Sequence, residues 1–160
     1  MTAMCSGPGE SNRYLEAHAA RLLESYRHWT GKSLVPPDLS PAEQARQLYF
    51  APFVVLSHDA APEPLLNYAN QAGLNLFELN WAQLTALPSR FTAEPLQQQE
   101  RAFLLARVTQ QGYIDDYRGV RISRAGRPFL IERATVWNLL DDCGAPYGQA
   151  ATFSEWKFLP

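Results

Sequence analysis

The alternation of apolar and polar positions between residues 53 and 89 predicts the start of a folded domain. Phe53 to Leu56 is a compact, β-branched run that predicts a strand, and extended character resumes from Leu65 to Tyr68. The proline-rich segment 59–64 between them predicts a turn, because proline fixes φ and removes a backbone donor. We therefore expect a short hairpin here.

Two asparagines follow the hairpin at positions where short helices are expected to begin. Asn70 and Asn80 can each accept hydrogen bonds from the first free backbone N–H groups of a helix. The hairpin, the step Tyr68-Ala69-Asn70 and the capped helices together resemble the front half of a PAS domain.

A second amphipathic pattern lies nearer the N-terminus. Ser11 is a predicted N-cap, and Gly31 a predicted stop, for a helix that ends near Thr30. Its apolar stripe needs a docking surface, because an isolated helix of this length is marginally stable. Two surfaces stay open, the outer face of the sheet and the same helix in a partner chain. The stripe consists of Tyr14, Leu15, His18, Leu22, Tyr26 and Trp29.

A proline-containing linker over residues 34–39 leads into a short helix from Pro41 to Tyr49. Ser40 and Glu43 form a predicted capping box, with Pro41 where its missing N–H costs nothing. The chain is thus predicted to have three parts. They are a disordered tail over residues 1–10, an N-terminal helix with its linker over 11–39, and the main PAS-like domain over 40–160.

The back of the main domain predicts one long helix and a β-meander. Thr92 is the predicted N-cap of a helix that runs to Gln111, where Gly112 ends it. The predicted buried side of this helix carries Leu96, Phe103, Leu104 and Val108. Three strands joined by tight turns follow, at 113–123, 129–140 and 147–158.

The element order β-β-α-α-α-β-β-β predicts an α+β fold. We expect a PAS-like, five-stranded antiparallel sheet with a helical cap on one face and an extra N-terminal amphipathic helix. Strand parity places Phe129, Ile131 and Trp137 on one face if no bulge intervenes. Parity also groups Tyr117 with Arg121, either on the outer face or in the pocket, and both assignments stay open.

Composition argues against several function classes. The chain has 46% hydrophobic residues, 19% charged residues and a net charge of −2, so it lacks the basic surplus of a nucleic-acid binder. No apolar run reaches the roughly 18–20 residues of a membrane-spanning helix, and Met1 to Glu10 lacks the apolar core of a signal peptide. Cys5 and Cys143 are distant thiols that indicate reduced residues. We therefore expect a cytoplasmic protein without nucleic-acid or membrane partners.

Motifs in the back half carry a more specific resemblance. They are Pro88-Ser89-Arg90, Thr92-Ala93-Glu94-Pro95, Glu100-Arg101, Tyr117-Arg118-Gly119-Val120-Arg121-Ile122, Gly126-Arg127-Pro128-Phe129, Val136-Trp137-Asn138 and Gly148-Gln149-Ala150-Ala151. In this order and spacing, over roughly Ser40 to Pro160, they resemble the MEKHLA domain, a PAS-like module.

What the resemblance implies is a sensory or regulatory role with a bound ligand. In plants the family sits at the C-terminal end of homeodomain-leucine-zipper transcription factors. It also occurs as short stand-alone proteins in bacteria and algae, and this chain resembles that second kind. The sequence contains no homeodomain or zipper, so DNA binding is not carried over. The family also supplies no catalytic residues to transfer.

Candidate catalytic and metal-binding residues do not combine into a site. Ser57-His58-Asp59 holds the residue types of a hydrolase triad, but neighbouring strand residues point to opposite faces. His18 and His28 lie too far apart on one helix to share an ion. Light-sensing flavin relatives need a reactive cysteine in an asparagine-cysteine-arginine motif that is absent here. Haem needs an axial histidine that residues 70–111 lack. The cofactor is therefore left unknown.

Arginines among apolar residues are the strongest binding candidates. A buried guanidinium must find a carboxylate or carbonyl groups. One interpretation pairs Arg101 or Arg121 with Glu94, which would hold the cap on the sheet. The other leaves one arginine for a ligand carboxylate or phosphate. The aromatic residues are similarly divided between core and cavity wall, and these alternatives stay open.

We therefore predict a cleft between the sheet and the cap from Asn70 to Gln111 that binds a small organic molecule, with an anion favoured by the arginines. One alternative is a structural domain with a filled core, forming a homodimer through the N-terminal helix. Another is a small-molecule enzyme, although no nucleophile–base pair supports it. The predicted ligand-binding residues are Asn70, Phe77, Trp81, Arg90, Arg101, Phe103, Tyr117, Arg121, Trp137 and Gln149.

Overall fold

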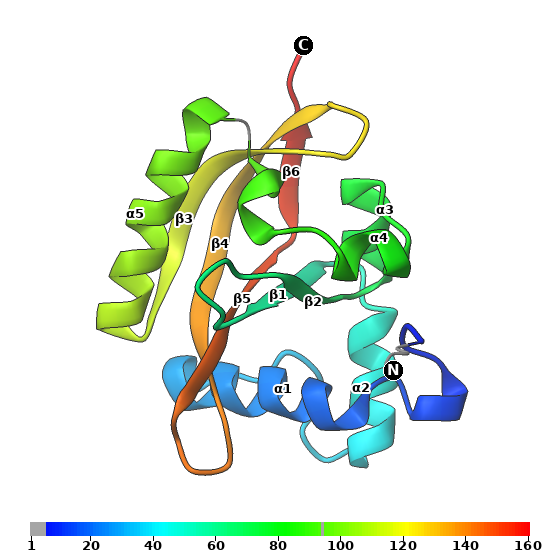
Figure 1. Cartoon of the computed structure of the whole chain (residues 1–160). Helices are drawn as coiled ribbons and strands as arrows, with labels where there is room; N and C mark the ends of the chain where they lie inside the picture. Colours follow the sequence, from blue (N-terminus) through cyan, green and yellow to red (C-terminus); the bar gives the residue numbers. More distant parts are fainter. Residues whose placement is uncertain (1–5, 94) are drawn as a thin grey trace.

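The chain folds around one antiparallel sheet with helices on both of its faces (Figure 1). This computed structural model describes residues 6–93 and 95–160, without the side chains of residues 95–97. The helices are η1 (Glu10–Asn12), α1 (Glu16–Thr30), α2 (Pro41–Tyr49), α3 (Gln71–Phe77), α4 (Trp81–Thr85), η2 (Ser89–Thr92) and α5 (Pro95–Gln111). The strands are β1 (Val54–Asp59), β2 (Leu66–Ala69), β3 (Tyr113–Ile122), β4 (Pro128–Leu140), β5 (Pro146–Phe153) and β6 (Glu155–Phe158).

The sheet joins the front hairpin to the back meander. Its spatial order is β2-β1-β5-β4-β3, every pair is antiparallel, and β6 pairs with β4 outside this path. The predicted last strand over 147–158 is interrupted at Ser154 and so becomes β5 and β6. The predicted α+β architecture with an antiparallel sheet is confirmed.

Three of the predicted N-caps are present. Ser40 Oγ accepts from the backbone N–H of Glu43 at 3.2 Å, and Asn80 Oδ1 accepts from that of Gln83 at 2.8 Å. Asn70 Oδ1 accepts from the N–H of Gly73 at 3.1 Å and from that of Val55 at 3.0 Å. The Asn70 side chain therefore begins α3 and also ties that helix to β1, which explains why it is fully buried.

The N-terminal helix begins four residues later than predicted, with Leu15 rather than Ser11 at the N-cap position. The segment from Arg13 to Leu15 has φ values of 52–55°, in the left-handed region, so helical geometry starts only at Glu16. Asn12 Oδ1 accepts from the N–H groups of Gly9 and Leu15, which supports this turn. The Ser11 N-cap prediction is therefore wrong, whereas Gly31 ends the helix with φ 74° as predicted. The predicted tail falls partly on residues 1–5, outside the described residues.

The stripe of α1 packs on the outer face of the sheet, defined here as the face covered by α1 and α2 (Figure 1). Leu22 is fully buried there, and the Tyr26 ring lies 5.0 Å from that of Trp137. Trp29 Nε1 donates to the carbonyl oxygen of Asn138 at 3.0 Å. Of the two predicted destinations for this stripe, the chain's own sheet is the one it occupies.

A bulge in β4 reverses the faces that strand parity predicted. Phe129 and Ile131 belong to the inner core beneath α3 and α5, but Trp137 belongs to the outer core. Between them Arg133 has φ 54°, and this left-handed residue shifts the alternation by one position. The predicted common face of Phe129, Ile131 and Trp137 is therefore wrong beyond the bulge.

The start of α5 and part of its buried face also differ from prediction. Thr92 lies in η2, where its hydroxyl donates to the Ser89 carbonyl at 2.8 Å, and it does not cap α5. Leu104 and Val108 are buried as predicted, but Phe103 is 71% exposed. Arg101 is buried on the same side of the helix as Leu104 and Val108. The side chain of Leu96 lies outside the described residues.

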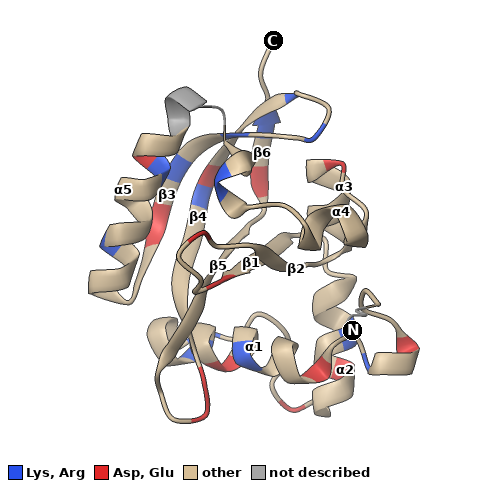
Figure 2. Ribbon diagram, viewed as in Figure 1, with Lys and Arg blue, Asp and Glu red and all other residues tan. Residues whose placement is uncertain are grey.

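Charges of both signs are interspersed along α5, β3 and β4 rather than gathered into one patch (Figure 2). In the part of the chain that the structure describes, no helix combines the length and apolar character needed to cross a membrane.

Candidate functional site

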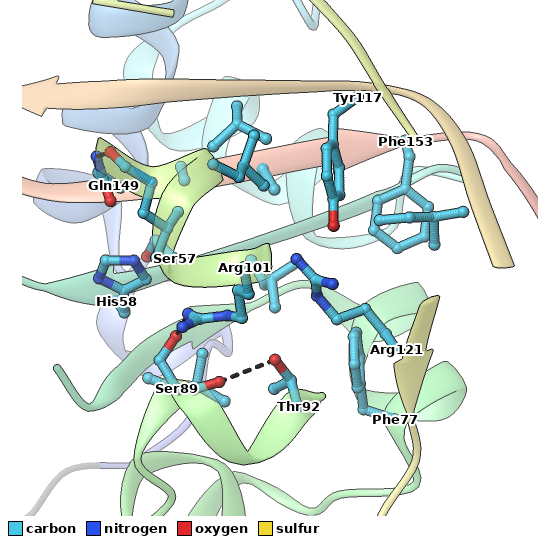
Figure 3. A pocket seen from close by; sticks show the side chains of 18 residues that line it. Ser57, His58, Phe77, Ser89, Thr92, Arg101, Tyr117, Arg121, Gln149 and Phe153 are labelled. Atoms are coloured by element: carbon cyan, nitrogen blue, oxygen red, sulfur yellow. Dashed lines mark hydrogen bonds between the residues drawn. The ribbon is translucent and has the colours of Figure 1, made fainter. Parts of the chain in front are cut away.

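A cavity lies between the inner face of the sheet and the segments η2 and α5 (Figure 3). Its volume is about 60 Å³, measured as the space open to the centre of a water molecule. One water requires roughly 10–15 Å³ on this measure, so the cavity has room for a compact ligand. The wall is formed by Leu56, Ser57, His58, Leu66, Phe77, Ser89, Thr92, Arg101, Leu104, Leu105, Tyr117, Arg121, Ile131, Val136, Gln149, Ala150, Ala151 and Phe153.

Two arginines from different elements meet in this wall. Arg101 enters from α5 and Arg121 from β3, with exposed fractions of only 9% and 8%. Arg101 Nη2 donates to Ser89 Oγ, and Arg121 Nη1 donates to the carbonyl oxygen of Val120 at 2.9 Å. Each guanidinium has five N–H donors, so most of this donor capacity is not used by another described residue and is available to a ligand in the cavity.

Neither guanidinium has a carboxylate partner among the residues whose side chains are described. The ion pairs of that part of the chain use other, more exposed arginines, such as Arg90 with Glu63 at 2.8 Å. Burial lowers the pKa of Arg101 to about 10, with the charge of Arg121 adding to the shift and Tyr117 opposing it. Glu94, the predicted internal partner, lies outside the described residues. Two buried like charges therefore attract an anion strongly, because an anion would offset the cost of burying them.

Tyr117 contributes a hydroxyl above these arginines (Figure 3). The Arg121 guanidinium carbon lies 5.2 Å from the centre of the Tyr117 ring, and Tyr117 Oη has no hydrogen-bond partner among the described residues. Gly119 makes this placement possible, because a Cβ at that position would collide with the tyrosine ring and hydroxyl. The irregular register of β3 around Tyr117 brings it onto the inner face with Arg121. Of the two predicted assignments, the pocket is the observed one.

His58 and Gln149 lie toward the other end of the cavity (Figure 3). His58 Nδ1 lies 2.8 Å from the carbonyl oxygen of Asp59, and its Nε2 has no partner among the described residues. Gln149 Nε2 donates to the Leu105 carbonyl oxygen, to Thr109 Oγ1 and to Asn138 Oδ1 at 3.1–3.2 Å. This amide therefore ties α5 to β4 and β5 at the edge of the cavity.

Half of the predicted ligand-binding residues line the cavity, and half lie elsewhere. The lining ones are Phe77, Arg101, Tyr117, Arg121 and Gln149.

The other five have different surroundings. Asn70 is used in capping α3, and Arg90 pairs with Glu63. Phe103 projects from α5 into solvent, so its predicted core position is wrong. Trp137 is buried on the outer face, on the far side of the bulge. Trp81 packs against both cores and lines a separate groove beside β2.

His58, Ser89 and Thr92 line the cavity but were not predicted as site residues. For His58 a signal existed, because strand parity puts it on the same face of β1 as Val54 and Leu56. Ser89 and Thr92 stood out only as members of the motifs that resemble the MEKHLA domain, since their placement in the wall depends on the 3-10 turn η2.

The structure separates the three residues that carry the letters of a catalytic triad. Ser57 Oγ contacts His18 Nε2 of α1 at 3.0 Å and donates to Asn67 Oδ1 on the outer side. His58 Nδ1 contacts the carbonyl oxygen of Asp59 and its Nε2 has no partner among the described residues, so neither nitrogen contacts Ser57 Oγ. Among the described residues, no three His, Cys, Asp or Glu side chains gather where they could hold a metal ion.

Sequence comparison places this geometry in a known context. The sequence profile of the MEKHLA domain matches residues 16–158. Homeobox-leucine zipper protein HOX32 of Oryza sativa subsp. japonica is 30% identical over 150 residues, which cover 90% of this chain and 17% of that protein. Homeobox-leucine zipper protein ATHB-9 of Arabidopsis thaliana is 32% identical over 96 residues, 60% of this chain and 11% of that protein. The chain thus spans less than a fifth of the length of these relatives.

Solved structures with the same fold include a PAS domain and Light-Oxygen-Voltage proteins. The PAS domain of a protein from Colwellia psychrerythraea superposes with a TM-score of 0.61 at 12% identity, covering 73% of this chain and 94% of that domain. An RNA-binding Light-Oxygen-Voltage receptor superposes with a TM-score of 0.58 at 19% identity, covering 76% of this chain and 34% of the receptor. These likenesses show a PAS/LOV-like fold.

A flavin, named with one further Light-Oxygen-Voltage domain of this fold, does not fit the cavity. About 60 Å³ is far below the roughly 300–1,000 Å³ of pockets that hold drug-sized molecules. No cysteine is among the lining residues, and Cys143 is exposed.

Proposed function

Because the chain belongs to the MEKHLA domain family and has a PAS/LOV-like fold, we propose that it is a non-catalytic sensory or regulatory module that binds a small organic anion between its sheet and α5. One observation carries this proposal. Arg101 and Arg121 are buried in the wall of one cavity with no carboxylate partner among the described side chains. An anion there would offset the cost of burying two like charges.

Binding would be transmitted by α5. Arg101 lies on this helix, and Asn138 Nδ2 donates to the carbonyl oxygen of Val108 near its C-terminal end at 3.0 Å. The carbonyl of Asn138 in turn accepts from Trp29 of α1. A ligand that pulls α5 toward β3 would therefore favour one position of α1, since a ligand shifts an equilibrium only by preferring one state.

The finer features of the proposal concern where and with what the module acts. We propose a cytoplasmic module of the stand-alone bacterial or algal kind, with no nucleic-acid or membrane partner. A homodimer through α1 stays a prediction. The stripe that suggested it packs on the sheet, so a dimer would use the exposed side of the helix, and the mass of the full chain in solution tests it.

Thermal unfolding of the full chain against small carboxylic acids and their neutral amides tests the function. A ligand present at 100 times its Kd stabilises the folded state by about 2.7 kcal/mol, which raises the Tm of a chain of this size by about 5–10 °C. We expect acids, and not amides, to produce this shift.

Substitutions of the two arginines test whether the rise in Tm originates in this cavity. Arg101→Gln and Arg121→Gln should abolish the shift, whereas Arg118→Gln should not, because Arg118 is exposed and pairs with Glu132 at 3.2 Å. The same acids and amides are tested on Glu94→Gln, because this substitution frees the two arginines if the Glu94 carboxylate pairs with them. If no compound stabilises either the natural chain or Glu94→Gln, the proposed function is wrong.

A further inference from the structure

Two residues of the cavity wall hold a buried polar atom that lacks a hydrogen-bond partner among the described residues. The atoms are His58 Nε2 and Tyr117 Oη. Four similar atoms, on Tyr68, Trp81, Trp137 and Tyr147, belong to residues outside this wall. Because a buried polar atom without a hydrogen bond is unfavourable, the two atoms in the wall show which groups a ligand should supply.

The tautomer of His58 determines one of these groups. Its Nδ1 lies 2.8 Å from the carbonyl oxygen of Asp59. A carbonyl oxygen can only accept, so Nδ1 carries the hydrogen. Burial lowers the pKa of His58 from 6.5, which keeps the ring neutral near pH 7. Nε2 is therefore an acceptor, and its complement in a ligand is a hydroxyl or an N–H donor.

The charge nearby favours a hydroxyl over an ammonium group. Arg101 lies beside His58 in the wall of the same cavity (Figure 3), so its positive charge acts on a group bound at the histidine. A ligand ammonium at Nε2 would be repelled by the same guanidinium. A neutral hydroxyl can donate to Nε2 without this repulsion.

The other end of the cavity calls for an acceptor with negative charge. Arg121 and Tyr117 lie at this end, with Arg101 between them and His58 (Figure 3). A carboxylate has acceptor sites enough for both guanidinium groups and the phenolic hydroxyl. The apolar remainder of the wall, including Leu104, Ile131 and Phe153, would cover a short carbon chain.

We infer that the ligand class of this site is a short hydroxy acid, whose carboxylate binds Arg101, Arg121 and Tyr117 and whose hydroxyl donates to His58 Nε2. The volume of about 60 Å³ restricts it to a few carbon atoms. This inference rests on the proposed function, because it specifies the ligand of the same cavity.

Calorimetric titration with matched pairs of acids tests the inference at pH 7. The pairs are glycolate with acetate, lactate with propionate, and 3-hydroxybutyrate with butyrate, and inorganic phosphate is titrated in parallel. In at least one pair the hydroxy acid should bind at least about fivefold more tightly, as expected for one hydrogen bond to an otherwise unsatisfied buried acceptor. His58→Phe should remove this preference while retaining carboxylate binding. His28→Phe, at an exposed position on α1, should leave the preference unchanged.

The outcomes separate this inference from the proposed function. Equal binding within every pair overturns the hydroxy-acid assignment and leaves a module for small organic anions. Binding of phosphate in place of the acids overturns both the hydroxy-acid assignment and the organic character of the proposed ligand. Binding of no anion overturns both. The pairs are compared in the natural chain first, so the test does not depend on the folding of His58→Phe.

Discussion

The outer face of the sheet is closed by packing, whereas the inner face borders a cavity whose two arginines have no carboxylate partner among the described side chains. Strand β1 contributes neighbouring residues to both. Ser57 on the outer side is held between His18 and Asn67, and His58 on the inner side keeps Nε2 without a partner among the described residues. The buried side chains of the outer core are neutral, with Trp137 and Leu22 fully buried.

This difference shows which face is structural and which is suited to binding. An unpartnered neutral hydroxyl or indole costs a modest amount, but a buried guanidinium without an anion costs several kcal/mol. Substitutions on the outer face should therefore destabilise the protein. Removing a charge from the inner face should have the opposite effect.

The largest expected effect is from Trp137→Ala on the outer face. Truncation of this fully buried ring should lower the free energy of unfolding by about 3–5 kcal/mol, because it leaves a cavity beside Tyr26. Urea unfolding measures the loss. Trp156→Ala, at a partly exposed ring on β6, is the matched control and should cost clearly less. Equal losses would contradict the assignment of Trp137 to a closed core.

The next effect is a pH dependence that originates at His18. Burial lowers the pKa of His18 from 6.5 to about 4. The unfolded chain therefore binds a proton more readily than the folded chain. The stability that the neutral, buried ring contributes is complete above pH 6.5 and is lost as the pH falls through 4. The loss approaches about 3 kcal/mol.

Urea unfolding of the natural chain and of His18→Leu between pH 7 and 4 measures the loss of stability that originates at His18. The difference between the two curves isolates His18 from His58, whose pKa is also lowered by burial. Parallel curves would show that His18 does not carry the pH dependence.

The smallest expected effect is a gain in stability on the inner face. Arg101→Met keeps the aliphatic stem and removes a buried charge, so the free energy of unfolding of the ligand-free chain should rise by about 1 kcal/mol. Arg118→Met, at an exposed ion-paired position, should change it by less than about 0.5 kcal/mol. A loss of about 3 kcal/mol or more from Arg101→Met would instead show that a carboxylate, such as Glu94, is paired with it.

Local signals in the sequence predicted the elements that depend on local physics. The caps at Ser40, Asn70 and Asn80 and the glycine stop at Gly31 are confirmed, because a cap is formed between residues only a few positions apart. The Ser11 cap is wrong, because three left-handed residues that follow it delay the helix.

Local signals in the sequence predicted only part of the candidate site. Arg121 and Tyr117 stood out as polar or amphipathic residues on apolar strands, and both line the cavity. Trp137 was misassigned to that face, because one residue with positive φ, Arg133, reverses the alternation. Phe103 was predicted on the buried side of α5, but Arg101 lies there and Phe103 is exposed. Which side of the helix is buried depends on the elements that it packs against.

By itself, the sequence determined the order of helices and strands, the antiparallel sheet and the apolar stripe of the first helix, since these follow from periodicity and from turn and cap residues. Tertiary structure alone decided that the stripe covers the chain's own sheet and that arginines from α5 and β3 line one cavity. Burial and like-charge proximity are properties of the packed chain, and no local pattern contains them.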